Sequence, residues 1–332
     1  EMLEIIEASP VRINAACALY GVCGGCHLQH IKYEAQLATK TAILTDCFAK
    51  IGHLHPPPIE VFSSPEYEYR NRMQLHKEAT DRDNGVILGL KGREGIVAVR
   101  DCLIAESGIR SLLQGGAKKN LSLPPDKDRF TVFSKDGLLL NEGGKERGKI
   151  RLMNKEIQVD AGAFFQSNCV MLEKLLAVLL ETASKADRFL PAADIYAGVG
   201  TFAVFLSSLF PKIDLVEENK RALSVARENL KGKDAAFFAC RDQDWVKEAR
   251  RLKTSYSFIT ADPPRTGLAP RLAAWLAEAG PPLLAYVSCD PASLARDSRI
   301  LTGGGYTLTS LIIFDFYPQT AHIESLAVFE KL

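Results

Sequence analysis

The chain has 332 residues, of which 47% are hydrophobic and 24% are charged, and its formal net charge is +1. These values are typical of a globular protein with room for two domains, and they exclude a disordered chain. No apolar run approaches the length of a membrane-spanning helix and the acidic N-terminus lacks a signal-peptide pattern, so we expect a cytoplasmic protein without a membrane contact. Eight cysteines in such a chain indicate reduced thiols, metal ligands or catalysis rather than disulfides.

Three of these cysteines, Cys17, Cys23 and Cys26, lie close together at the spacing C-x5-C-x2-C. The glycine pair between the last two lets the backbone wrap, so that two thiolates converge on one centre. Cys102 is the candidate for a fourth ligand. The residues alone leave open an all-thiolate iron–sulfur cluster and a structural zinc site completed by cysteine or by a nearby histidine.

The middle of the chain favours a small β domain. A helix is predicted over 33–51, and three prolines at 56–58 end it. Short β-like runs separated by turn signals then predict a mostly antiparallel domain to about residue 158, interrupted by a helix over 104–118. Residues 66–155 carry 18 Lys and Arg against 13 Asp and Glu, so this is the basic part. Arg70 and Arg72 alternate with tyrosines, which suits RNA contacts as well as it suits an exposed strand.

From residue 161 the pattern alternates between strands and helices. A helix over 169–183 precedes strands predicted at 193–196, 212–216, 235–239, 256–261 and 283–288. Helices are predicted between them, at 201–209, 219–230, 243–252, 269–279 and 291–301. The last two strands, 306–316 and 324–330, follow without a helix between them. The pattern predicts a doubly wound α/β sheet with an antiparallel edge hairpin.

The first strand of this region leads into a glycine turn, A-D-I-Y-A-G-V-G-T-F at 193–202. Gly198 and Gly200 allow a sharp turn against which a ligand can lie. Glu217 follows the next strand, 17 residues beyond Gly200, near the spacing at which a carboxylate binds ribose hydroxyls. The third glycine of a pyrophosphate site is absent, which favours S-adenosylmethionine over a dinucleotide. Taken alone, the turn is also compatible with an ordinary strand–turn–helix.

Three further clusters follow predicted strands, where an α/β sheet places its active site. Asp262 and Arg265 lie in D-P-P-R-T-G, Cys289 lies in S-C-D-P, and Glu324 lies in H-I-E-S. We expect a cofactor loop, a nucleophile and a base to converge on one face. Cys289 precedes a predicted helix whose N-terminal amides would lower the thiol pKa, although a lone cysteine here could simply be buried.

Together these motifs make the chain resemble the S-adenosylmethionine-dependent RNA uracil-5-methyltransferases, specifically the iron–sulfur branch that acts on ribosomal RNA. The resemblance covers nearly the whole chain and also uses Y-R-N-R at 69–72 and F-F-Q-S-N at 164–168. It implies a class I (Rossmann-like) methyltransferase domain over 159–332. It also implies an iron–sulfur and central β domain that contacts RNA over 13–158, with residues 1–12 as the remnant of an N-terminal β-barrel.

The resemblance also assigns roles to single residues. The implied ligands of a [4Fe-4S] cluster, with zinc as the alternative, are Cys17, Cys23, Cys26 and Cys102. Cys289 is the implied nucleophile and Glu324 the implied general base. The implied contacts of S-adenosylmethionine are Gln166, Tyr196, Gly198, Gly200, Thr201, Glu217, Asp242 and Asp262, with Asp244 as the rival of Asp242. The expected RNA contacts are Arg70, Arg72 and Arg265.

The activity implied is transfer of a methyl group to carbon 5 of a uridine, through a covalent bond between Cys289 and carbon 6. The expected partner is RNA, with 23S rRNA favoured and tRNA as the alternative. No obligate protein partner is evident, and we expect a monomer. Two other interpretations are an amino-group methyltransferase, which Arg265 argues against, and a non-catalytic RNA-binding protein, which would be expected to have lost Cys289 or Glu324.

Overall fold

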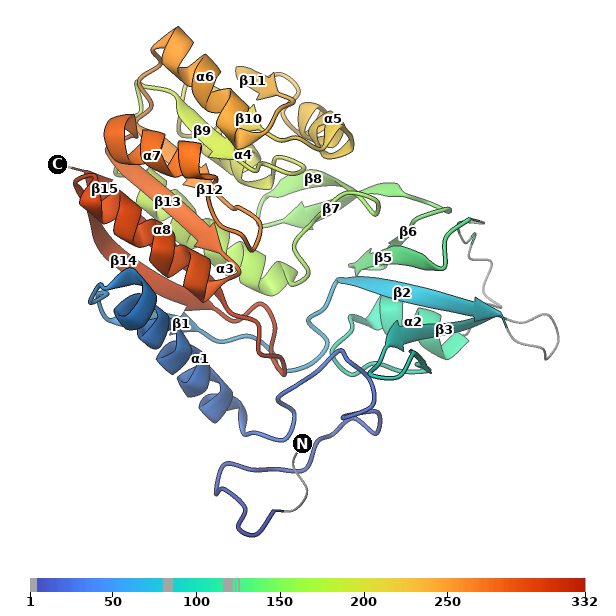
Figure 1. Ribbon diagram of the computed structural model, residues 1–332. Coiled ribbons are helices and arrows are strands. Elements are labelled where there is room, and N and C mark those ends of the chain that lie inside the picture. The colour runs from blue at the N-terminus through green and yellow to red at the C-terminus, as the bar shows by residue number, and fades with distance from the viewer. Residues whose placement is uncertain (1–4, 80–85, 116–121, 123, 125, 332) are drawn as a thin grey trace.

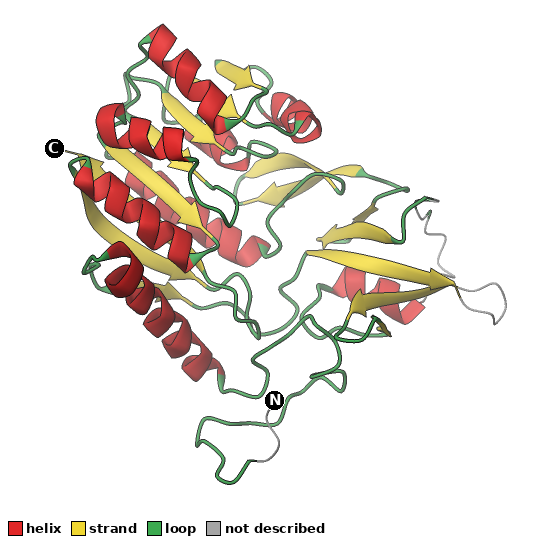
Figure 2. Ribbon diagram, viewed as in Figure 1, coloured by secondary structure: helices red, strands yellow, loops and turns green. Residues whose placement is uncertain are grey.

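The computed structural model describes residues 5–79, 86–115, 122, 124 and 126–331 (Figure 1). A large twisted sheet with helices on both faces lies beside a smaller sheet, as the colouring in Figure 2 makes clear. Within the described residues, no helix is long and apolar enough to cross a membrane. The turn expected at 83–85, the end of the helix expected over 104–118 and the first four residues of the expected barrel remnant lie outside the described residues.

The large sheet contains eight strands in the order β1-β14-β15-β13-β12-β9-β10-β11. Their bounds are Ile59–Phe62 (β1), Ala192–Ile195 (β9), Ile213–Val216 (β10), Ala235–Phe238 (β11), Phe258–Ala261 (β12), Leu283–Ser288 (β13), Tyr306–Phe314 (β14) and Glu324–Lys331 (β15). Strand β15 runs antiparallel to both neighbours, and the other adjacent pairs are parallel. The predicted doubly wound sheet with an antiparallel hairpin is therefore confirmed.

The helices of this part are α3 (Cys169–Ala183), α4 (Thr201–Leu206), α5 (Lys220–Asn229), α6 (Asp242–Leu252), α7 (Pro270–Ala279) and α8 (Pro291–Gly303). Helices α3, α5 and α8 have N-cap residues whose side chains accept hydrogen bonds from backbone N–H groups of the first turn. These residues are Asn168, Asn219 and Asp290. Helices α3, α4 and α5 contribute to one apolar core, and α6, α7 and α8 contribute to a second. The central strands β9, β12 and β13 are buried along their whole length between these cores, which explains their nearly continuous apolar sequences.

The N-terminal helix and the first strand belong to this larger part, which differs from our expected division at 158. Helix α1 (Tyr33–Cys47) continues into a π-helical turn, η1 (Phe48–Gly52), whose Phe48 packs in the second core. Strand β1 pairs in parallel with β14, on the side of β14 that faces away from β15. We expected both elements in the domain over 13–158. A four-residue strand carries no local signal of its partner, so its sheet is chosen only by tertiary packing.

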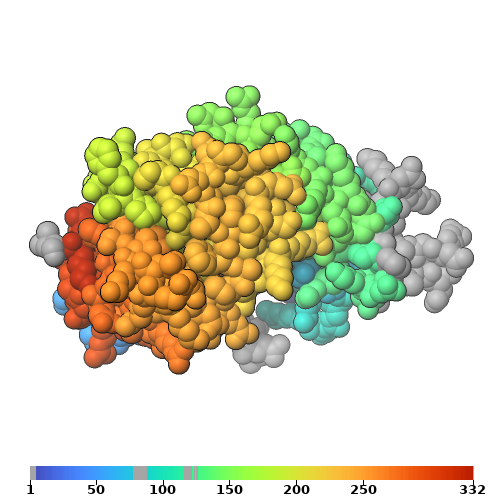
Figure 3. Space-filling view, turned by 90° about the horizontal axis from the view of Figure 1, so that it is seen from above, coloured from blue at the N-terminus to red at the C-terminus, as the bar shows by residue number. Residues whose placement is uncertain are grey.

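The smaller sheet is antiparallel, as predicted, in the order β4-β3-β2-β5-β6. Its elements are β2 (Arg72–Ala79), β3 (Val86–Lys91), β4 (Ile96–Ala98), β5 (Arg129–Lys135) and β6 (Leu138–Asn141), with α2 (Ser107–Gly115) packed against it. The hairpin β7 (Arg147–Leu152) and β8 (Lys155–Asp160) pairs separately and joins the first core. The β-like runs predicted in this part are 60–62, 72–76, 86–90, 96–99, 130–133 and 149–152, so the predictions do not include β6 and β8. Figure 3 shows the green surface of these central strands continuing into the yellow and orange surface of the larger part.

Candidate active site

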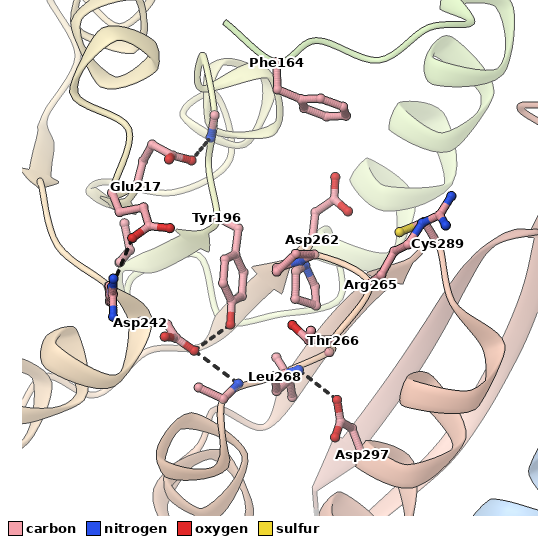
Figure 4. A pocket seen from close by; sticks show the side chains of 18 of the residues that line it. Phe164, Tyr196, Glu217, Asp242, Asp262, Arg265, Thr266, Leu268, Cys289 and Asp297 are labelled. Carbon is pink, nitrogen blue, oxygen red and sulfur yellow. Dashed lines mark hydrogen bonds and ion pairs between the residues drawn. The ribbon is translucent and has the colours of Figure 1, made fainter. Parts of the chain in front are cut away.

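A cavity of about 1120 Å³ lies at the carboxyl ends of the large-sheet strands. It opens where the strand order reverses between β9 and β12, the position at which open α/β sheets bind ligands. Its lining includes most of the predicted site residues, namely Arg70, Gln166, Tyr196, Gly198, Glu217, Asp242, Asp262, Arg265, Cys289 and Glu324. In Figure 4, Asp262 lies between Tyr196 on one side and Cys289 with Arg265 on the other.

Three of the predicted cofactor and RNA contacts lie outside this lining. Thr201 lines a small adjoining cavity beneath the glycine turn. Gly200 holds the turn itself, with φ +78° and a hypothetical Cβ 3.1 Å from the Cβ of Ala226. The Arg72 guanidinium lies 5.8 Å from the ring centre of Phe164, which itself lines the main cavity.

The glycine turn fixes the position of Glu217. The N–H of Gly198 donates to Oε2 of Glu217 at 2.9 Å, and the N–H of Asn219 donates to Oε1 at 2.7 Å. Gly198 has φ +55°, the left-handed conformation that glycine adopts without strain. The turn and the acid after the next strand are therefore held as one unit at the cavity wall.

The structure distinguishes between the two candidate acids after β11. Asp242 lines the cavity, where its Oδ2 accepts from the Tyr196 hydroxyl at 2.5 Å and from the Ala269 N–H at 3.3 Å. Asp244 lies on the exposed side of the same helix and pairs with Lys247 at 2.8 Å. Asp242 is thus the acid that a ligand in this cavity would meet.

Asp262 and Gln166 form a second polar pair in the cavity. Nε2 of Gln166 donates to Oδ2 of Asp262 at 3.2 Å, and the N–H of Asp262 donates to the carbonyl of Ile195. Burial raises the pKa of Asp262 to about 7. Oε1 of Gln166 is buried and has no partner among the described residues, so it is an acceptor available to a ligand.

Cys289 and Glu324 meet across the antiparallel pair β13 and β15. Ser288 pairs with Ser325, so the next position in the same register places Cys289 opposite Glu324. Burial raises the pKa of the Cys289 thiol to about 11, with further increases from Glu324 and Asp262, while the Arg265 cation opposes them. Our expectation that the N-terminus of α8 would lower this pKa was therefore wrong. Burial, Glu324 and Asp262 together outweigh the two groups that lower this pKa, the Arg265 cation and the backbone of Cys289 itself.

Glu324 itself is only 4% exposed, and this burial raises the pKa of its carboxyl well above the ordinary value. The negative charge of Asp262 adds to the shift and the Arg265 cation reduces it. A carboxylate with a raised pKa is a stronger base than one in water. The site therefore combines a thiol with a strong carboxylate base, both at the wall of one cavity.

Two residues of the site were not predicted individually. Tyr317 and His322 line the cavity from the loop that joins β14 to β15, and their rings meet edge to face at 5.6 Å. Nδ1 of His322 lies 3.2 Å from Nη2 of Arg265. Burial, with Arg265 and His27 nearby, lowers the pKa of His322 to about 4 and keeps the ring neutral. The histidine of H-I-E-S was the sequence signal for this position.

A second cavity, of about 300 Å³, is lined by Cys17, Cys23, Cys26 and Cys102 together with Arg70. Residues 17–28, called the cysteine segment below, are attached to the smaller sheet, because the N–H of Gly24 donates to the carbonyl of Lys91. Among the described residues, no group of three or more His, Cys, Asp and Glu side chains is arranged to hold a metal ion. Arg70 lines both cavities and thus lies between the cysteines and the active site.

Comparison with known proteins gives consistent results. A family model described as tRNA (Uracil-5-)-methyltransferase matches residues 146–332. A Treponema denticola protein, named as an uncharacterized RNA methyltransferase, is 32% identical over 99% of this chain and 86% of its own length. The 23S rRNA (uracil(1939)-C(5))-methyltransferase of Pseudomonas entomophila is 28% identical over 98% of this chain and 82% of that protein.

A solved structure shows the same fold. The tRNA (uracil-54, C5)-methyltransferase of Pyrococcus abyssi, in complex with S-adenosyl-L-homocysteine, is similar with a TM-score of 0.74 at 23% identity, over 98% of this chain and 88% of that one. The family model matches more than half of this chain, and the Treponema denticola protein is 32% identical across nearly all of it. This chain therefore belongs to the tRNA (uracil-5-)-methyltransferase family.

Proposed function

We propose that this chain transfers a methyl group from S-adenosylmethionine to carbon 5 of a uridine in RNA. The observation that carries the proposal is the position of Cys289 opposite Glu324, at the wall of the cavity that also contains the glycine turn. A methyltransferase acting on an amino group has no use for this thiol. A non-catalytic RNA-binding protein has no use for a buried carboxylate base beside it.

The cavity fits S-adenosylmethionine. Glu217, held by the glycine turn, is suited to the ribose hydroxyls, and Asp242 lies in the cavity near it. The unpartnered Oε1 of Gln166 is an acceptor for the ammonium group of the methionine part, with Asp262 beside it. Gly198, Gly200, Tyr196 and Thr201 shape the turn against which the ligand lies. When bound, S-adenosylmethionine supplies an electrophilic methyl group.

The chemistry requires activation of the base, because carbon 5 of uracil is too weakly nucleophilic to take a methyl group unaided. The Cys289 thiolate adds to carbon 6, the π pair of the C5–C6 double bond becomes the C4–C5 π bond, and the π pair of the C4–O4 carbonyl moves onto oxygen 4 to give an enolate. Carbon 5 of this enolate takes the methyl group, which leaves S-adenosylhomocysteine. Glu324 then removes the proton from carbon 5, the double bond re-forms and the cysteine leaves as thiolate.

The substrate base must leave its stack to reach Cys289, so the target lies in a flipped or single-stranded position. Arg70 and Arg265 line the cavity, and Arg72 lies near it on Phe164, so these three cations are placed to contact RNA phosphates or bases. We favour 23S rRNA, since the Pseudomonas entomophila relative is named for uracil 1939 of that RNA. A tRNA is the alternative, because the Pyrococcus abyssi structure is named for uracil 54 of tRNA.

We also propose that Cys17, Cys23, Cys26 and Cys102 hold a [4Fe-4S] cluster. All four line one cavity, although they come from two separate segments. Four cysteine thiolates are the donor set that holds iron–sulfur clusters in proteins, and these four thiols face the same cavity. Zinc remains the alternative metal. The domain division we propose is correspondingly a cysteine-bearing central β part and a methyltransferase part that includes α1 and β1.

The test is methylation of unmodified transcripts of 23S rRNA and of tRNA with S-adenosylmethionine, followed by mass spectrometry of the nucleosides. We expect 5-methyluridine in one of them and none with Cys289→Ala. Glu324→Gln should stop the reaction after methyl transfer and leave a covalent RNA–protein adduct on a denaturing gel. Full activity of Cys289→Ala would refute the proposed chemistry.

A further inference from the structure

The loop at 315–323 connects β14 to β15 and ends directly before Glu324. It supplies Tyr317 and His322 to the wall of the active-site cavity. Its conformation therefore decides the surroundings of the carboxylate. A loop of this kind must be held firmly, because a displacement of about 1 Å in a catalytic group can slow a reaction roughly a hundredfold.

Gln319 is the strained residue of this loop. It is 2% exposed and has φ +66°, in the left-handed region that non-glycine residues rarely adopt. Such a conformation costs about 1–3 kcal/mol and persists only where its surroundings over-determine it. The surroundings of Gln319 should therefore contain the contacts that fix the loop.

The backbone and the side chain of Gln319 are both bonded. Its carbonyl accepts from the N–H groups of His27 at 2.9 Å and Leu28 at 3.0 Å, and its own N–H donates to Oε1 of Gln36 at 3.0 Å. Its side-chain Oε1 accepts from Nε2 of Gln36 at 2.9 Å, and its Nε2 donates to Oε2 of Glu66 at 3.0 Å. Gln36 is fully buried, and its side-chain amide bonds to both the side chain and the backbone N–H of Gln319 in the interior.

These partners lie in the N-terminal part of the chain, outside residues 146–332 that the family model matches. Gln36 belongs to α1, and His27 and Leu28 follow directly after Cys26. Two further contacts come from the same side. Lys40 of α1 pairs with Asp315 at 2.6 Å, and the Tyr69 hydroxyl donates to the carbonyl of Pro318 at 2.9 Å. The loop before Glu324 is thus fixed by α1, by the cysteine segment and by residues 66–69 between β1 and β2.

Cys289 is held by separate contacts. Asp290 caps α8 by accepting from the N–H of Ser293 at 2.8 Å, and the Ser288 hydroxyl bonds to the backbone of Asp290. None of the Gln319 contacts described above involves β13 or α8. A change at Gln319 should therefore disturb the carboxylate and its loop more than the thiol.

We propose that Gln319 is a positioning residue for proton removal: paired with Gln36 and bonded to the cysteine segment, it holds the 315–323 loop so that Glu324 is aimed at carbon 5 of the target base. This inference rests on the covalent chemistry proposed above. It assigns the N-terminal part of the chain a role in the second half of the reaction, after the methyl group has been transferred.

The experiment compares Gln319→Gly with the wild type. Glycine accepts the positive φ and the backbone bonds, so the substitution removes only the side-chain contacts. The full-length protein is mixed with S-adenosylmethionine and with unmodified 23S rRNA and tRNA transcripts that carry tritium at carbon 5 of uridine. We expect tritium release to slow about tenfold or more, the covalent RNA–protein adduct to accumulate, and the affinity for S-adenosylmethionine to stay unchanged. Gln36→Ala, which removes the partner amide, should give the same pattern.

Two control variants make the result specific. Glu324→Gln provides the adduct expected when the base is absent. Asn141→Ala removes another buried amide, which donates to the carbonyls of Ser122 at 2.7 Å and Glu142 at 2.9 Å in the smaller sheet, far from the loop in sequence. It should lower stability without accumulating the adduct.

The outcomes separate the inference from the function. If Glu324→Gln traps the adduct while Gln319→Gly and Gln36→Ala do not, the positioning role is wrong and the proposed function stands. If tritium release and adduct formation fall together in both glutamine variants, the role of Gln319 is merely structural and the inference is again overturned. If Glu324→Gln traps nothing although the wild type methylates RNA, the covalent chemistry fails and the inference fails with it.

Discussion

Cys289 and Glu324 occupy opposed positions at the end of the β13–β15 ladder, and the carboxylate helps to raise the pKa of the thiol to about 11. Cys289, the nucleophile we propose, is therefore a thiol in the free protein at neutral pH. It must be converted to thiolate when the substrates bind, and the positive charge of a bound sulfonium favours that conversion.

The pH dependence of Cys289 alkylation tests this electrostatic arrangement. Because the thiol loses its proton with a pKa of about 11, the rate of reaction with iodoacetamide should rise about tenfold per pH unit from pH 7 to 10. Mass spectrometry of the Cys289 peptide gives the rate. Arg265→Met should slow the reaction, since it removes the cation that favours the thiolate, whereas Arg241→Met, at the rim and paired with Glu218, should not. A plateau below pH 9 would show that the helix amides dominate after all.

Glu217 should be required for cofactor affinity. Its two carboxylate oxygens already accept backbone N–H groups of Gly198 and Asn219, so the side chain is fixed before a ligand arrives. Loss of charge-assisted bonds to ribose in Glu217→Ala should weaken binding of S-adenosylmethionine by about 10- to 100-fold in a calorimetric titration. Glu248→Ala is the matched control, because Glu248 lies on α6 outside the cavity lining, is 43% exposed and pairs with Arg251. Equal losses in both variants would contradict the assignment.

The sequence predicted the methyltransferase part of this fold well for identifiable reasons. The central strands are buried on both faces and read as apolar runs, and capping residues such as Asn219 and Asp290 mark where helices begin. Predicted bounds in this region therefore agree with the structure within a few residues. The carboxyl ends of parallel strands converge, so Asp262 and Cys289 could be placed at one site from their positions after strands alone.

The features that could not be predicted from the sequence depend on contacts between residues that are far apart in the chain. The partner of β1, the anchors of Gln319 and the direction of the Cys289 pKa shift are all set by residues from other parts of the chain. Local patterns carry no information on such contacts. The helix N-terminus beside Cys289 and the approach of Asp262 and Glu324 were visible in the sequence, whereas the burial of the thiol, the largest cause of its raised pKa, became visible only in the folded chain.

The proposed metal site predicts that replacing Cys102 and replacing Cys47, two half-buried cysteines, will have different effects on the metal content. Cys102→Ser should remove iron and acid-labile sulfide from the purified protein, because Cys102 lines the four-cysteine cavity. Cys47→Ser should retain both, since Cys47 lies on α1 and packs against the second core. Metal and sulfide analysis of anaerobically purified protein provides the measurement. If the wild-type protein contains zinc and no acid-labile sulfide, the four cysteines form a zinc site and the cluster proposal is wrong.

The turn after Asp262 contains a glycine whose replacement should be costly. Gly267 has φ +77°, and a Cβ at this position would lie 2.4 Å from Oδ2 of Asp297. That oxygen accepts from the N–H of Leu268 and from the Tyr286 hydroxyl, both at 2.8 Å, so it cannot move without breaking two buried bonds. Gly267→Ala should therefore lower the free energy of unfolding by about 2–4 kcal/mol, the sum of backbone strain and a disturbed bond.

The matched control for this substitution is Gly303→Ala. Gly303 ends α8 and has no atom within 4 Å of its hypothetical Cβ, so alanine there should be neutral or slightly stabilising. Urea unfolding measures both variants. Because Asp297 bonds the turn that follows Asp262, Gly267→Ala should also weaken S-adenosylmethionine binding when measured well below its unfolding midpoint. A Gly267→Ala protein as stable as the control would show that Asp297 can move away, and that it does not fix this turn.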